Sequence, residues 1–147
     1  MGITGTVPAK VTIGELVITP VVRTTRFVDL AGSLVAAGGW LTVLTDSGEG
    51  QLDEFLVRCP KINFKVLVAV DVVSVFSKTH GELCEIGQNS PDISAFAELD
   101  MNGDPTGYYV ASIRDIPYQI SILMRVQNTG LAPVTFSQLF AKYTIKE

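Results

Sequence analysis

The stretch that decides the fold covers residues 118–147 and reads YQISILMRVQNTGLAPVTFSQLFAKYTIKE. Its first part alternates apolar with polar residues, which is typical of a strand with one buried face. The apolar positions are Ile120, Ile122, Met124 and Val126. Asn128 and Gly130 tolerate positive φ and favour a turn directly after this strand. We therefore predict a C-terminal hairpin whose second strand covers residues 134–146.

The second strand of this hairpin changes its pattern part-way. Val134 and Phe136 occupy one face, and the apolar positions then move to the opposite parity. The later set is Leu139, Ala141, Tyr143 and Ile145. Because one extra residue in a strand exchanges its two faces, a β-bulge near Ser137 and Gln138 would reconcile the two patterns.

Short segments with strand character recur along the rest of the chain, and helical periodicity is almost absent. The longest covers residues 60–77 and is apolar on both faces at its centre, which favours cover by a second layer or another subunit. Around Gly38 and Gly39 we expect a hairpin turn rather than a helix over residues 30–37. Other expected strand regions are 10–26, bent or divided at Pro20, and 54–59, 83–86, 93–99 and 107–113.

These segments predict an all-β fold, an antiparallel β-sandwich of jelly-roll type with roughly nine or ten strands. The 147 residues fit one domain, which we place at residues 10–147. Residues 1–9, rich in Gly and Thr, show no periodicity and are expected to form a flexible N-terminal arm. Such an arm can also add to the sheet edge of a neighbouring subunit.

The composition favours self-association over binding to nucleic acid or membrane. Charged residues make up 18% of the chain, hydrophobic residues 47%, and the mean hydropathy is +0.35. A single chain of this size has difficulty covering so much apolar surface, so we expect a homo-oligomer. The net charge of -4 without a basic cluster disfavours nucleic acid, and no apolar run is long enough for a membrane helix. The residues chosen as possible interface positions are Val66, Val68, Val70, Phe136, Phe140 and Tyr143.

No catalytic, cofactor-binding or metal-binding residue is predicted, and we expect a protein without enzymatic activity. His80 is the only histidine, so a metal site of the common His-rich kind cannot be assembled from one chain, and we expect a solvated loop residue. Cys59 and Cys84 match no metal or redox spacing and are expected to be reduced and buried, although neighbouring strands could pair them. Asp100, Asn102 and Asp104 copy the start of a calcium loop that lacks its glycine and its final glutamate, which favours a plain turn.

Aromatic residues offer an alternative function. Trp40, Tyr108 and Tyr109 could form a surface on which sugar rings stack, as in a carbohydrate-binding or adhesion module. Aromatic residues of this kind more often belong to a core or an interface.

The phrase RVQNTGLAPVTF at residues 125–136 resembles the strand-turn-strand segments of immunoglobulin-like modules and viral β-sandwich proteins. The whole chain is similar in type to the capsid auxiliary, or decoration, proteins of tailed bacteriophages, which are small, charge-poor and all-β. This resemblance implies a non-enzymatic viral structural protein, made in the host cytoplasm and located on the capsid surface of the virion. It also implies a homotrimer that binds the lattice of the major capsid protein, with no cofactor.

Overall fold

The computed structural model describes residues 11–13, 16–18 and 22–146, and these ranges contain thirteen strands and one helix. The arm predicted for residues 1–9 lies outside them. The strands are β1 (Val11–Ile13), β2 (Leu16–Ile18), β3 (Arg23–Asp29), β4 (Ser33–Val35), β5 (Trp40–Ser47), β6 (Gly50–Cys59), β7 (Phe64–Val70), β8 (Ser74–Thr79), β9 (Ile93–Leu99), β10 (Pro105–Tyr118), β11 (Ser121–Asn128), β12 (Val134–Phe136) and β13 (Gln138–Lys146), and the helix is α1 (His80–Gly87).

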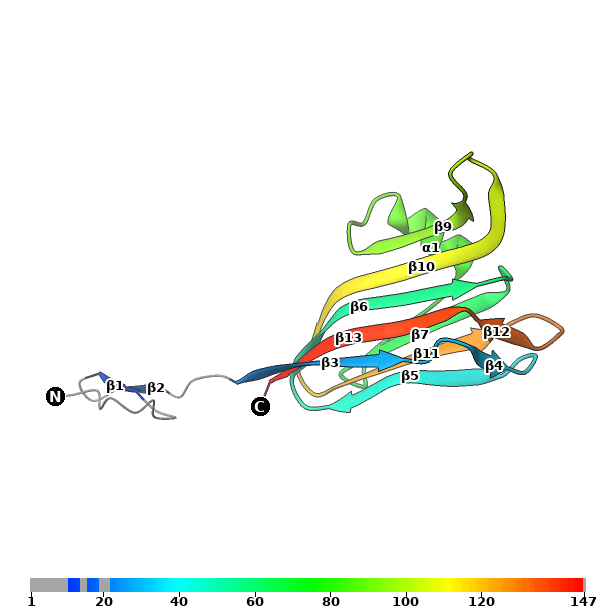
Figure 1. The fold of residues 1–147 in the computed structure, drawn as a ribbon. Helices are drawn as coiled ribbons and strands as arrows, with labels where there is room; N and C mark the ends of the chain where they lie inside the picture. Colours follow the sequence, from blue (N-terminus) through cyan, green and yellow to red (C-terminus); the bar gives the residue numbers. More distant parts are fainter. Residues whose placement is uncertain (1–10, 14–15, 19–21, 147) are drawn as a thin grey trace.

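Two antiparallel sheets pack face to face, which confirms the predicted all-β sandwich (Figure 1). One sheet has the strand order β3-β13-β6-β10-β9, and the other has the order β5-β11-β7-β8. Buried residues alternate with less buried ones along β6 and β11, so each sheet turns one face inward. The core between the sheets includes Phe55, Phe64, Met124 and Leu139, each fully buried.

The predicted C-terminal hairpin is wrong, because its two strands belong to different sheets. β11 pairs with β5 and β7, whereas β13 pairs with β3 and β6. Asn128 does not reverse the chain onto itself. Its buried amide donates to the carbonyls of Val35 and Ala132, at 3.0 and 2.8 Å, and its side-chain oxygen accepts from the N–H of Gly130. These hydrogen bonds hold the segment through which the chain passes from the four-stranded sheet to the five-stranded sheet.

The predicted change of face in the last strand is confirmed. The N–H of Ser137 donates to the carbonyl of Arg58 at 2.9 Å, while Gln138 is the register partner of the same residue. Ser137 itself lies in neither strand, because it separates β12, which pairs with β4, from β13, which pairs with β3 and β6. The face therefore changes at a break between two strands, and the expected β-bulge within one strand is not found there. Residues on both sides of this point are buried in the core, namely Val134, Phe136, Leu139, Ala141 and Tyr143.

Three other strand predictions need correction. Residues 60–77 form not one strand but the hairpin β7–β8, which reverses at Asp71 and Val72. Gly38 and Gly39 lie in the turn between β4 and β5, but these strands do not pair, since β4 pairs with β12 and β5 with β11. Residues 83–86 lie in α1 instead of a strand. The local pattern suited a strand in each case, but a tight turn divides residues 60–77, a capping box begins α1, and pairing with distant strands separates β4 from β5.

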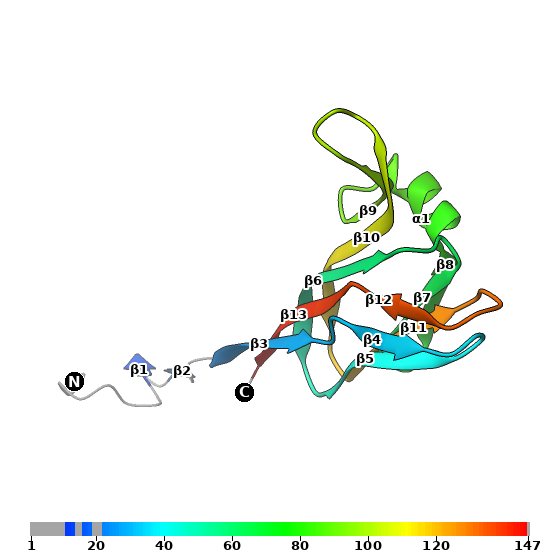
Figure 2. The same ribbon diagram turned by 45° about the vertical axis from the view of Figure 1, so that its right-hand side comes forward.

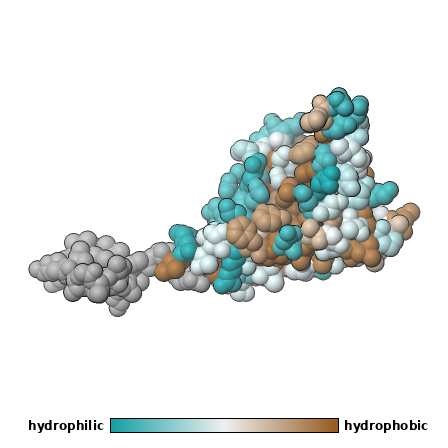
Figure 3. All heavy atoms as spheres, in the orientation of Figure 1, coloured by the Kyte–Doolittle hydropathy of each residue, from teal (hydrophilic) through white to brown (hydrophobic). Residues whose placement is uncertain are grey.

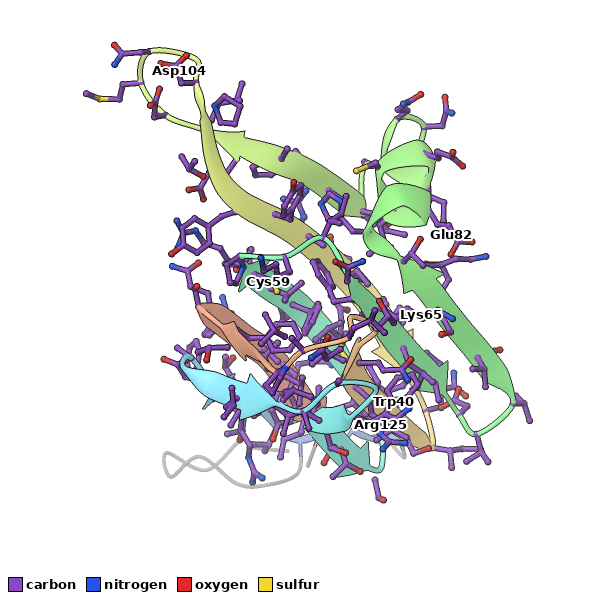
Figure 4. All side chains as sticks on the ribbon, turned by 90° about the vertical axis from the view of Figure 1, so that its right-hand side faces the viewer. Trp40, Cys59, Lys65, Glu82, Asp104 and Arg125 are labelled. Atoms are coloured by element: carbon purple, nitrogen blue, oxygen red, sulfur yellow. The ribbon has the colours of Figure 1, made fainter. Side chains whose placement is uncertain are left out.

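Helix α1 bridges the two sheets on one side of the sandwich, between the end of β8 and β9 (Figures 2 and 4). Thr79 and Glu82 begin it with a capping box, in which each side chain bonds the backbone N–H of the other. Leu83 is fully buried and ties the helix to the core.

Phe136 tests how strongly the short strand β12 is tied to the core. Its side chain is fully buried and meets Phe64 edge to face, with ring centroids 6.1 Å apart. Phe136→Ala should lower the free energy of unfolding by about 3–5 kcal/mol in urea denaturation, because the cavity cannot close completely. Leu131→Ala, at a fully exposed position nearby in the sequence, should change it by less than about 0.5 kcal/mol. Equal effects would place Phe136 outside the cooperative core.

Candidate functional site: an apolar groove between the free sheet edges

An apolar groove lies between β8 and β9, which are edge strands of the two sheets and do not pair with each other. Its volume is about 530 Å³, and of the nine residues that line it only Ser74 is polar. Val68 and Ile113 form its buried floor, while Val73 and Ile93 come from the two sides. The groove exists because β8 and β9 are edge strands of different sheets. Helix α1 covers the gap between these edges at the C-terminal end of β8, where the helix begins.

The turn between β7 and β8 presents exposed valines beside this groove. We call Asp71, Val72 and Val73 the valine turn. Val72 and Val73 are 74% and 83% exposed, and Ile120 beside them is 63% exposed. Monomeric proteins rarely expose contiguous apolar surface without a binding role. The valine turn and the groove together form the strongest candidate for a binding site in the described part of the chain.

Backbone strain is concentrated in this turn. Asp71 and Val72 have φ angles of 54° and 67°, in the left-handed region. Aspartate tolerates this region, but a β-branched valine rarely adopts it, at a cost of about 1–3 kcal/mol. Such strain persists only where the surroundings hold it, and it occurs most often at functional sites.

The Asp71 carboxylate holds the strained turn in place. One of its oxygens accepts backbone N–H groups from Gln119, Ile120 and Ser121, at 2.9, 2.7 and 3.3 Å. The backbone N–H of Asp71 also donates to the carbonyl of Ser121 at 2.8 Å. The hydrogen bonds from Ile120 and Gln119 lower the pKa of Asp71, since they favour its charged form. The valines are therefore presented on a fixed turn.

A second apolar surface lies on the outer face of the five-stranded sheet. Phe27 is 64% exposed and contacts the half-buried Phe140, with ring centroids 6.1 Å apart. Leu56 is the register partner of Phe140. In the space-filling view, apolar residues extend over the middle of the visible face (Figure 3).

The predicted interface residues are not brought together on a surface. Four of them, Val66, Val68, Phe136 and Tyr143, are at most 8% exposed and belong to the core of the single chain. Their side chains pack against the opposite sheet and have little surface left for a neighbour. Val70 lines the groove, and Phe140 lies on the outer face described above, so these two remain accessible.

The aromatic residues of the alternative hypothesis are separated from one another, and each contacts a neighbouring side chain. The guanidinium of Arg125 lies 5.1 Å from the Trp40 ring centre, and the two side chains are adjacent in Figure 4. The guanidinium of Arg58 covers Tyr108 at 3.5 Å, and Tyr109 meets the His80 ring at 5.5 Å. Trp40 belongs to the four-stranded sheet and the tyrosines to the other, so they form no common stacking surface.

Arg58 is itself fixed by an ion pair. Its Nε and Nη2 atoms each lie 2.8 Å from an oxygen of Glu98. The hydrogen bond from Arg58 lowers the pKa of Glu98 to about 2. The charge that covers Tyr108 is therefore already paired across β6 and β9.

His80 is buried, in contrast to the predicted solvated loop residue. Its Nε2 lies 3.1 Å from the carbonyl of Phe96 and 3.2 Å from that of Val110, so it must donate a proton to them. Its Nδ1 faces the Cys84 sulfur at 3.7 Å. Burial raises the pKa of the Cys84 thiol, which favours the protonated form over the nucleophilic thiolate. The ring therefore connects the start of α1 to β9 and β10.

The other candidate ligands form local structure. Cys59 and Cys84 are both free thiols, the first buried and the second half-buried. Asp100 Oδ1 accepts the N–H groups of Asn102 and Asp104, at 2.8 and 3.0 Å, which is the predicted turn. Among the described residues, no group of three or more His, Cys, Asp or Glu side chains could hold a metal ion. The same part of the chain contains no helix long and apolar enough to cross a membrane.

Comparison with known proteins assigns no family to the chain. No protein-family model matches the sequence, and no curated protein matches it. The site must therefore be interpreted from its own chemistry.

One feature near the site could have been found in the sequence, and another could not. The spacing Thr79-x-x-Glu82 is a capping-box signature and indicates the start of α1. By contrast, Val72 carries no turn signal, since valine is disfavoured at positive φ. Asp71 was the only usable sign of a reversal within residues 60–77.

Replacing Val72 by glycine should stabilise the folded chain. Val72→Gly removes the positive-φ strain and little buried surface, so the free energy of unfolding should rise by about 1 kcal/mol in urea denaturation. Val73→Gly is the matched control, because its φ is not in the left-handed region, and it should lose about 0.5–1 kcal/mol. If both variants changed the free energy of unfolding in the same direction, the result would contradict backbone strain at Val72.

The charge of Asp71 should make stability depend on pH. Since its pKa is lowered in the folded state, the ionised form contributes stability above about pH 4, and this contribution is lost as the pH falls. Asp71→Asn keeps tolerance of positive φ and one acceptor oxygen but removes the charge. This variant should melt at a lower temperature than the wild-type chain at pH 7, and the difference between the two melting temperatures should disappear at about pH 2.

Asp115→Asn is the control for this measurement. Asp115 also has a φ in the left-handed region, 58°, and it is exposed, so the same substitution is made in a similar backbone conformation. It should leave the melting temperature nearly unchanged. A pH-independent loss in Asp71→Asn would show that shape, rather than charge, holds the turn.

Proposed function

We propose that this protein is a non-enzymatic viral structural protein that decorates and stabilises a capsid as a homo-oligomer, with a trimer as the assembly. The observation that carries the proposal is the apolar groove with the exposed valine turn beside it. A surface of this kind is stabilised when a partner covers it, since burial of apolar area contributes about 25 cal/mol per Å².

The shape of the site favours a protein partner over a small polar ligand. Sugar sites combine aromatic faces with several hydrogen-bonding side chains, whereas this groove offers one serine. The cores of protein–protein interfaces are depleted of charged residues in the same way. The outer-face pair Phe27 and Phe140 provides a second contact surface, as a subunit that touches both its own copies and a capsid lattice requires.

The viral setting rests on similarity of type. The chain shares small size, low charge and an all-β fold with the decoration proteins of tailed bacteriophages. In this setting it would be made in the host cytoplasm and would bind the lattice of the major capsid protein on the virion surface. Shape and apolar contact would provide the affinity, and no cofactor would be required.

Native mass spectrometry of the full chain at micromolar concentration tests the proposal. The wild-type chain should give a trimer, and Val73→Asp should shift it to the monomer, because a charge would be buried without a partner. Leu131→Asp, at an equally exposed apolar position on another loop, should leave the trimer intact. A wild-type chain that is purely monomeric would contradict the proposal, as would a trimer insensitive to Val73→Asp.

A further inference from the structure

Half of the edge strand β8 lacks the features that normally protect a free edge. The half next to α1 carries Lys78, whose Nζ lies 3.8 Å from Glu82, and the helix follows directly. The other half, Ser74–Phe76, carries no charge and borders the groove. In the described part of the chain β8 pairs with β7 alone, so its outer backbone groups are available for another strand.

The described residues include a segment suited to this edge. β1 and β2 pair with each other and with no strand of the sandwich, and in Figures 1 and 2 they lie beyond the end where β3 begins. Their register joins apolar residues, Val11 with Ile18 and Ile13 with Leu16. An isolated two-stranded hairpin is marginally stable in water, so this one gains from addition to a larger sheet.

The chemistry of the segment matches that of the groove. No charged residue lines the groove, and none occurs within β1 or β2. The groove volume of about 530 Å³ also suffices, since a cavity of about 150 Å³ already holds a benzene-sized group. Several aliphatic side chains can therefore be accommodated together with a strand paired along β8.

The length of chain between β2 and β3 decides whether the β1–β2 segment can reach the groove of its own copy. β3 and β9 lie at opposite edges of the five-stranded sheet, so about 19 Å separates them at four spacings of about 4.8 Å. Five residue steps from Ile18 to Arg23 cover at most about 18 Å when fully extended. The edge of β8 lies farther still, in the second layer about 10 Å away. The segment of one copy therefore cannot reach the groove of that copy.

We propose that the β1–β2 segment of one copy pairs with the free edge of β8 in a second copy and fills its groove. The inference rests on the proposed self-assembly and names the contact responsible. A segment and a groove are different surfaces, so head-to-tail links between copies form a ring when the rotation closes. Three copies linked in this way would give the proposed trimer, whereas reciprocal exchange of segments between two copies would give a two-fold dimer.

Complementation between two full-length variants tests the contact. Leu16→Asp disables the segment and keeps the groove, while Ser74→Asp places a carboxylate in the groove and keeps the segment. Each variant alone should lose about a hundredfold in self-association affinity, measured by analytical ultracentrifugation. Mixed together, they should form a 1:1 complex in native mass spectrometry, since the intact segment of one can enter the intact groove of the other.

Ser77→Asp is the matched control for the groove variant. Ser77 lies on the same strand, nearer to α1, and does not line the groove, so self-association should persist. Hydrogen exchange should also show protection of the amides of β8 in the wild-type oligomer and loss of this protection in Leu16→Asp.

The outcomes separate the two proposals. A wild-type chain that remains monomeric contradicts the proposed function and the inference together. An oligomer that Leu16→Asp and Ser74→Asp leave intact contradicts the inference alone, as does a mixture that forms no 1:1 complex although both variants are folded and monomeric.

Discussion

The structure depends on the packing of two sheets between which the chain alternates several times, although the neighbouring strands β7 and β8, and β9 and β10, each stay within one sheet. β5 and β11 belong to one sheet, while β6 and β13, which follow each of them, belong to the other. Neither sheet can bury its inner face without the other, so the core and the strand order stabilise each other. The buried Asn128 shows the constraint locally, because a fully hydrogen-bonded polar side chain occupies the crossing point between layers.

The same alternation leaves one side of the sandwich open. β8 and β9 end their respective sheets, and the chain connects them through α1 instead of a paired strand. The helix closes one end, where His80 is bonded to the carbonyls of Phe96 and Val110. The groove remains at the other end, beside a strained turn held by one carboxylate. The surface most available for binding thus follows from how the edges are closed.

The sequence predicted elements whose signals are local and failed where distant pairing decided. The alternation in β11, the change of face at Ser137 and the bounds of β9 follow from the periodicity of side chains. The pairing of β13 with β3 and β6 does not, because a turn signal such as Asn128 fits both a hairpin and a crossover. Apolarity on both faces of residues 60–77 marked the region correctly but could not separate the core residues Val66 and Val68 from the exposed Val72 and Val73.

The position of β13 between β3 and β6 has a consequence for synthesis. This strand lies between β3 and β6, so the five-stranded sheet cannot close until residues 138–146 have left the ribosome. Until then β3 and β6 both present unpaired edges, over a chain already more than a hundred residues long. Formation of this sheet is therefore expected to be slow and to wait for residues 138–146, and the incomplete chain with its unpaired strand edges is the state most prone to aggregate.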